Sequence, residues 1–215
     1  DLGKKTKIRK ITFTGDKFFK DNKLKSIIVS EEYKFWKFIS GKKYLQEDTV
    51  KLDKRLLKNF YLNKGFYNVK INSSFAKLND EDNFELIFSI NANNKYFFND
   101  LTLNLPLDYD KNNYSEVTNL FAKLKNKPYS ISRIEKIINT IDKISITEQF
   151  ESTKSTVKEN IIDNKINIEF NVEDAERIVI KKINILGNNI TKENVIRNRL
   201  EIDEGDLYNE ILALK

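Results

Sequence analysis

The sequence predicts an α+β protein built as a tandem array of β-α-α-β-β modules, each a three-stranded sheet covered on one face by two helices. Two observations lead to this prediction. Apolar and polar residues alternate in short segments typical of strands, and these segments recur at a fixed interval along the 215 residues. Hydrophobic residues make up 40% of the chain, enough for several small cores. A chain of this length suits two or three domains better than one module.

The repeat is clearest in two segments with apolar residues at every second position, residues 84–90 and 166–172. Such alternation is typical of a strand with one buried face. The segments lie 82 residues apart and align without a gap, with Phe84, Leu86, Phe88 and Ile90 matching Ile166, Ile168, Phe170 and Val172. Because an interval of this length is typical of an array of domains, we expect each copy to be a separate module.

A second match extends the array to a third unit. Residues 11–15, Ile-Thr-Phe-Thr-Gly, resemble residues 183–187, Ile-Asn-Ile-Leu-Gly. The glycines suit a strand exit that needs a backbone conformation other residues avoid. We therefore predict modules at residues 1–92, 93–175 and 176–215, the last without its two closing strands. For that last segment we expect either poor order on its own or the opening part of a longer module.

Each module is predicted to begin with a strand and a helix. The strands are residues 8–14, 98–105 and 178–186, and the helices are residues 18–28, 115–124 and 192–200. The first two modules then have a helix with a wider apolar stripe, formed by Leu52, Leu56, Leu57, Phe60 and Tyr61 in one and by Ile134, Ile137, Ile138 and Ile141 in the other. The closing hairpins are residues 67–75 with 84–91 and residues 150–157 with 165–172, across polar turns at 79–83 and 160–164.

Local signals mark the helix ends and the order of the strands. Ser115 and Thr191 are predicted N-caps, and Ser132 with Glu135 is a predicted capping box. Gly65 stands where a C′ glycine stops a helix. The rules of chain connection place the first strand of each module beside the last one, which leaves the middle strand at an edge of the sheet.

The composition argues against an enzyme. The chain has neither cysteine nor histidine, so disulfides, thiolate nucleophiles and histidine bases are excluded. Carboxylates at residues 80–82 fall in a predicted turn, and Asp203, Glu204 and Asp206 lack the spacing of an EF-hand loop. We expect no catalytic residues, no cofactor and no metal. The net charge of +6 comes from lysines interspersed with acidic residues, which is typical of a solvated surface.

Several motifs resemble those of POTRA domains. They are residues 56–67, with the helix end and Gly-Phe-Tyr; residues 183–191, Ile-Asn-Ile-Leu-Gly-Asn-Asn-Ile-Thr; and residues 204–208, Glu-Gly-Asp-Leu-Tyr. An aromatic insertion at residues 32–40 resembles a loop of the third POTRA domain of BamA-like proteins. The chain is therefore similar to the third, the fourth and the start of the fifth POTRA domain of a BamA-like outer-membrane β-barrel assembly protein. The middle module departs from the motifs at residues 104–106 and 146–150.

This resemblance implies a periplasmic scaffold of a Gram-negative outer-membrane protein, continued by a C-terminal barrel in that membrane. It implies unfolded outer-membrane proteins and accessory assembly lipoproteins as partners, and no nucleic acid. Edge strands offer unpaired backbone groups to an added strand. The candidate binding edge is Tyr67, Asn68, Val69, Lys70, Ile71, Asn72 and Ser73. The bland alternative is an ordinary edge shielded by Lys70.

A candidate docking loop contains Tyr33, Phe35, Trp36 and Phe38, whose alternative is a core or inter-domain seam. Other POTRA-bearing proteins remain alternatives for the chain as a whole: a TamA-like translocation factor, a two-partner secretion transporter or a divisome protein. The alternative from another class is a KH-like RNA-binding module. That module needs a Gly-x-x-Gly loop between its helices, which the sequence lacks.

Overall fold

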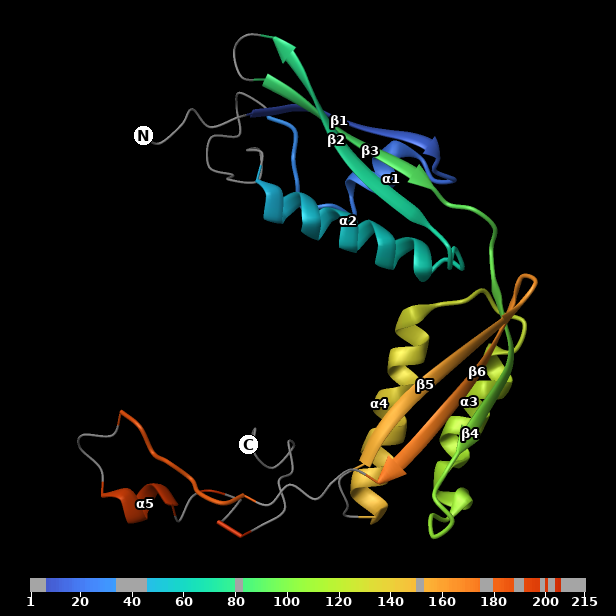
Figure 1. The fold of residues 1–215 in the computed structure, drawn as a ribbon, viewed down its shortest axis with the longest axis vertical. Coiled ribbons are helices and arrows are strands. Elements are labelled where there is room, and N and C mark those ends of the chain that lie inside the picture. Colours follow the sequence, from blue (N-terminus) through green and yellow to red (C-terminus); the bar gives the residue numbers. More distant parts are fainter. Residues whose placement is uncertain are drawn as a thin grey trace. The chain divides into compact units, whose positions relative to one another are not determined.

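The computed structural model describes residues 7–33, 46–79, 83–149, 153–174, 180–187, 192–197, 200 and 204–205. The chain divides into two compact units. The first holds residues 1–100, 123–135 and 160–167, and the second holds residues 101–122, 136–159 and 168–215. The described residues form two three-stranded sheets with helices beside them, which confirms the predicted α+β class (Figure 1).

The first sheet and its helices lie within residues 7–91. The elements are β1 (Lys7–Asp16), α1 (Asp21–Lys25), α2 (Glu47–Leu62), β2 (Lys70–Asn79) and β3 (Asn83–Asn91). The sheet order is β1-β3-β2, with β1 parallel and β2 antiparallel to β3. The prediction that the first strand lies beside the third, and that the second lies at an edge, is therefore confirmed.

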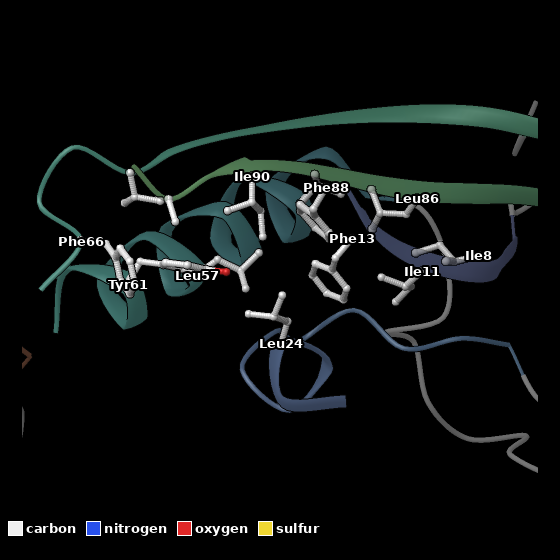
Figure 2. Packing of buried hydrophobic residues seen from close by; sticks show 13 residues of the cluster. Ile8, Ile11, Phe13, Leu24, Leu57, Tyr61, Phe66, Leu86, Phe88 and Ile90 are labelled. Carbon is white, nitrogen blue, oxygen red and sulfur yellow. The ribbon is translucent and has the colours of Figure 1, made fainter. Parts of the chain in front are cut away.

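The core of this module gathers on the helix side of β3. Leu86, Phe88 and Ile90 alternate along the strand and are almost completely buried. Phe13 of β1 stacks on Phe88 with ring centroids 5.5 Å apart. Figure 2 shows the side chains of the two helices pointing toward these strands, among them Leu24, Leu57 and Tyr61. Burying each such side chain contributes about 1.5–3 kcal/mol, so the apolar stripe holds both helices on one face of the sheet.

Helix α1 is shorter than predicted. The sequence predicts a helix over residues 18–28, whereas α1 covers only Asp21–Lys25. Phe18 stands just before it with a φ of 57°, a left-handed conformation that interrupts a right-handed helix. The Phe18 ring lies 4.9 Å from that of Phe66, centroid to centroid. Contacts of aromatic side chains therefore set the start of the helix, which apolar periodicity did not reveal.

Helix α2 ends at the glycine that the sequence marks. Gly65 has a φ of +94°. The Phe66 N–H donates to the Tyr61 carbonyl (3.1 Å), and the Gly65 N–H donates to the Leu62 carbonyl (3.2 Å). These two bonds and the contact between the Tyr61 and Phe66 rings (5.6 Å) define a Schellman motif with Gly65 at C′. The chain is thereby turned back toward the sheet just before β2.

The second sheet lies within residues 97–174 and repeats the strand order of the first. Its order is β4 (Phe97–Asn104), β6 (Lys165–Asp174) and β5 (Thr153–Ile162), so the strand that is first along the chain again lies beside the last. The 3₁₀ turn η2 (Lys111–Tyr114) and helices α3 (Ser115–Leu124) and α4 (Ile131–Gln149) connect β4 to β5. The closing turn is shorter than predicted because β5 continues to Ile162.

The helix starts of this module differ from the prediction. Ser115 is not an N-cap, because η2 precedes it and the Asp110 side chain accepts the Asn112 N–H (2.9 Å) instead. The predicted capping box at Ser132 is also wrong. Its N–H donates to the side-chain Oδ1 of Asn63 (2.9 Å), which also accepts the Ser130 hydroxyl (2.8 Å). A residue that follows α2 in the chain thus caps the start of α4.

The third segment repeats contacts of the first module 172 residues later. In the first module Glu32 Oε1 accepts the Ile11 N–H (3.0 Å) and the Lys25 Nζ (2.6 Å). In the third, Glu204 Oε1 accepts the Ile183 N–H (3.0 Å) and the Arg197 Nη1 (3.2 Å). We call each set a carboxylate clasp. The Tyr33 N–H donates to the Ile8 carbonyl (2.7 Å), and the Gly205 N–H donates to the Ile180 carbonyl (2.8 Å), at the same offset.

The third segment therefore contains the opening contacts of a module. Helix α5 covers Glu193–Arg197, within the predicted helix. Residues 180–187, the described part of the predicted strand 178–186, do not form a strand. A strand needs a neighbour to pair with, and no neighbouring strand faces this stretch among the described residues. The predicted N-cap Thr191 lies outside the described residues.

Replacing Gly15 by Ala should destabilise the first module strongly. Gly15 has a φ of +83°, and a Cβ there would lie 2.4 Å from the Ile90 carbonyl oxygen, so β1 and β3 would have to separate. We expect a loss of about 3 kcal/mol in the free energy of unfolding, measured by urea denaturation. Gly65→Ala is the matched control, since its φ is similar but its nearest contacts are 3.2 Å away. Equal losses in the two variants would contradict the clash.

Acid should open the carboxylate clasp of the third segment. The Ile183 N–H, followed by Arg197, holds the pKa of Glu204 below its ordinary value of 4.5. A lowered pKa means that the clasp stabilises above that ordinary value and is lost as pH falls through the lower folded one. We expect the Ile183 amide to lose protection from hydrogen exchange between about pH 6 and pH 3. Glu204→Gln should lose it at both values, and unchanged protection would refute the clasp.

Candidate functional site

The backbone of β2 turns a regular set of groups toward the open edge of the first sheet. The Ala92 N–H, just after β3, donates to the Asp16 carbonyl (2.9 Å), so alternate β3 residues face β1. The remaining β3 residues face β2, where they pair with Lys70, Asn72, Ser74 and Ala76. It follows that Ile71, Ser73 and Phe75 direct their N–H and C=O groups away from β3, toward the edge.

The opposite edge of the sheet, on β1, is covered. The Ile8 carbonyl accepts the Tyr33 N–H (2.7 Å), and the Ile11 N–H donates to Glu32 (3.0 Å). The Phe13 carbonyl accepts the Lys17 ammonium (3.0 Å). Because these outward groups of β1 already have partners, β2 is the edge of this sheet that remains available for an added strand.

The structure moves the predicted edge segment along the chain. The prediction started the strand at Tyr67, but β2 begins at Lys70 and runs to Asn79. Tyr67 places its ring 5.0 Å from that of Tyr129, centroid to centroid, and Asn68 donates to the Tyr96 hydroxyl (2.7 Å). The Val69 N–H donates to the Phe66 carbonyl (3.3 Å). These three residues form the turn before the strand, because their polar groups are held by neighbours other than β3.

The predicted residues within β2 alternate in exposure. Lys70 and Asn72 are exposed, whereas Ile71 and Ser73 are half-buried on the helix side. At the far end, a register shift between Lys77 and Asn79 leaves Leu78 out of regular pairing. Lysines and bulges are common devices against unwanted edge pairing. The regular, open part of the edge is therefore the middle of β2, from Ile71 to Phe75.

A groove of about 530 Å³ lies between α2 and this part of β2. It is lined by Glu47, Val50, Lys51, Lys54, Ser73 and Phe75. The Lys51 ammonium lies 2.9 Å from the Glu47 carboxylate, and this pair raises the pKa of Lys51 and lowers that of Glu47. Sequence reasoning missed the groove because its two walls are separated along the chain.

The predicted docking loop is described only at its start. Tyr33 lies under the Lys7 ammonium, 4.9 Å from the ring centroid, and under the Arg9 guanidinium, 4.8 Å away. Such cation–π contacts at an exposed site contribute about 0.5–1 kcal/mol. Tyr33 thus belongs to the cover of the β1 edge. The other three predicted residues, Phe35, Trp36 and Phe38, lie outside the described residues.

No group of acidic side chains suited to holding a metal ion occurs among the described residues. The buried carboxylate of Asp53 accepts the N–H groups of Val29 (2.6 Å) and Ser30 (3.3 Å), so it ties the loop after α1 to α2. Within the same part of the chain, no helix is long and apolar enough to cross a membrane. The geometry described here thus favours a surface for polypeptide more than a catalytic centre.

A family described as "POTRA: Surface antigen variable number repeat" matches residues 6–93 and 178–213. The match omits the middle module, where the sequence departs from the family's motifs. The second sheet nevertheless has the same strand order as the first. In that module the fold persists where the motifs do not.

Curated relatives and solved structures agree with this match. The outer membrane protein assembly factor BamA of Buchnera aphidicola is 28% identical over 98% of this chain, and that of Neorickettsia risticii is 27% identical over 95%. The chain spans about a third of their length, 34% and 28%. The crystal structure of Haemophilus influenzae BamA POTRA3-5 matches with a TM-score of 0.73 at 20% identity, covering 96% of this chain and 81% of that one.

Proline substitutions should distinguish the two backbone directions in β2. Ser73→Pro removes an N–H that faces the edge, whereas Ser74→Pro removes one that faces β3 and leaves a buried acceptor without its donor. We expect Ser74→Pro to lower the free energy of unfolding by about 2 kcal/mol more than Ser73→Pro. Urea denaturation followed by circular dichroism measures both. The reverse ranking would mean that the deduced directions are wrong.

Proposed function

This chain belongs to the POTRA family, and on that premise we propose that it is the periplasmic scaffold of an outer-membrane protein assembly factor. The relatives named above carry that function in their names. Under this proposal the modules are residues 1–92, 93–175 and 176–215, the scaffold performs no catalysis, and a membrane barrel follows in the complete protein. The names of the relatives favour assembly over the transporter alternatives, and the family favours it over RNA binding.

The proposed activity is the capture of unfolded β-barrel proteins by strand addition to β2. The observation that supports it most directly is the open edge at Ile71, Ser73 and Phe75, beside a β1 edge that is already covered. An extended chain that pairs there continues the sheet through main-chain hydrogen bonds. Each such bond contributes a net of about 0.5–1.5 kcal/mol, so a few of them give weak, reversible binding that suits a transient client.

Docking of accessory lipoproteins forms the second part of the proposal. The aromatic segment at residues 33–38 is the candidate surface, as the resemblance implies. Tyr33 supports it because that residue is fixed against β1 through its backbone and through Lys7 and Arg9. Residues that follow Tyr33 therefore start from a defined place on the sheet, next to the covered edge and apart from β2.

Strand addition predicts that Ser73→Pro weakens client binding while Ser73→Ala does not. Proline removes one edge-facing N–H and obstructs its neighbour, whereas alanine leaves the backbone unchanged. We expect fluorescence polarisation of a labelled, strand-forming peptide from an outer-membrane protein to show binding at least about fivefold weaker for the proline variant.

Circular dichroism of both variants serves as the control, because the proline variant must keep the fold for the comparison to count. Equal affinity of the folded Ser73→Pro and Ser73→Ala proteins would rule out β2 as the capture edge.

A further inference from the structure

We propose that the groove between α2 and β2 selects which strands join the edge, and that it favours strands carrying both an apolar side chain and a carboxylate on their helix-side face. This inference rests on the proposed strand addition to β2. Backbone pairing alone accepts almost any sequence, because every non-proline residue offers the same N–H and C=O groups. The groove supplies the side-chain discrimination that the backbone lacks.

The register of the sheet shows which side chains meet the groove. Ser73 pairs with Phe88 and Phe75 pairs with Leu86, so both point to the helix side, where those β3 residues are buried. A strand added to β2 would lie about 4.8 Å beyond it, with alternate side chains on that same face. Half of the guest's side chains therefore enter the space between the new strand and α2, and the other half point away from the helices.

The floor of the groove is apolar and incompletely covered. Phe75 lies on the core side of β2, yet 45% of its surface is exposed. Val50 of α2 also lines the groove and is buried. An apolar guest side chain at this position would cover the Phe75 ring, and burying such a group is favourable by about 25 cal/mol per Å². Leucine, valine or phenylalanine on the guest would gain here, whereas serine would not.

The charges of the groove are predominantly positive. Lys51 is already paired with Glu47, but no carboxylate among the described residues pairs with Lys54. Strand β2 itself carries Lys70 and Lys77 and no acidic residue. A guest carboxylate beside Lys54 gains an ion pair, whereas a guest lysine or arginine meets like charge. The groove therefore favours amphipathic strands with acidic residues among their apolar ones.

Three ten-residue peptides of the same length and β-propensity test this preference. On one face the first alternates valine with glutamate, the second valine with lysine, and the third serine with glutamine, while the other face is identical in all three. We expect the valine–glutamate peptide to bind the full chain about fivefold more tightly than the valine–lysine one, and the serine–glutamine peptide to bind most weakly.

Variants of the protein assign this preference to the groove. Lys54→Glu should reverse the ranking of the glutamate and lysine peptides. Lys58→Glu is the matched control, since Lys58 is exposed one turn later on α2 and does not line the groove. Phe75→Ser should weaken the valine–glutamate peptide about threefold and leave the serine–glutamine peptide unchanged.

The outcomes separate this inference from the proposed function. If all three peptides bind equally, or if Lys54→Glu and Lys58→Glu act alike, the groove does not select and only the inference falls. If the peptides bind with the expected ranking but Ser73→Pro has no effect, the groove binds them without strand addition and the proposed function falls. Absence of any binding would refute both.

Discussion

The first module depends on the central strand β3, whose period of two serves the sheet and the core at once. Along its backbone, one set of residues faces β1 and the other faces β2. Along its side chains, Leu86, Phe88 and Ile90 face the helices and are buried. A slip of one residue would expose all three, at about 1.5–3 kcal/mol each, so the core holds the register. The irregular pairs lie near the strand ends, between Ile8 and Lys10 and between Lys77 and Asn79.

The register of β3 in turn decides which edge stays open. Outward groups of β1 receive Tyr33, Glu32 and Lys17, so the loop that follows α1 covers that edge. The same carboxylate clasp recurs in the third segment, where no closing strand is present among the described residues. The clasp is therefore a local device that needs only the opening strand region, one helix and a glutamate. Coverage of the β1 edge then precedes, in structural terms, the completion of the sheet, and the edge that remains is β2.

An open edge brings a hazard as well as a use. Unpaired strands invite pairing between copies of the same protein, and lysines or bulges oppose it. Strand β2 has both, since Lys70 and Lys77 are like charges in any pairing with itself and Leu78 interrupts the regular ladder. The same positive charge that discourages a second copy favours a guest with carboxylates, as does Lys54 across the groove. One distribution of charge thus suits both the avoidance of self-association and the proposed choice of client.

The sequence by itself determined the modular fold, since a period-two alternation and a repeat of 82 residues are local patterns that survive without tertiary information. It also placed the strand order and the C′ role of Gly65, because connection rules and backbone conformation depend on few neighbours. Only the tertiary structure decided where β2 begins, because Tyr67 and Asn68 alternate like a strand but are held by Tyr129 and Tyr96. It alone revealed that Asn63 caps α4 and that α2 and β2 enclose a groove. Both features join residues distant along the chain, and no local pattern encodes a contact whose partner is set by packing.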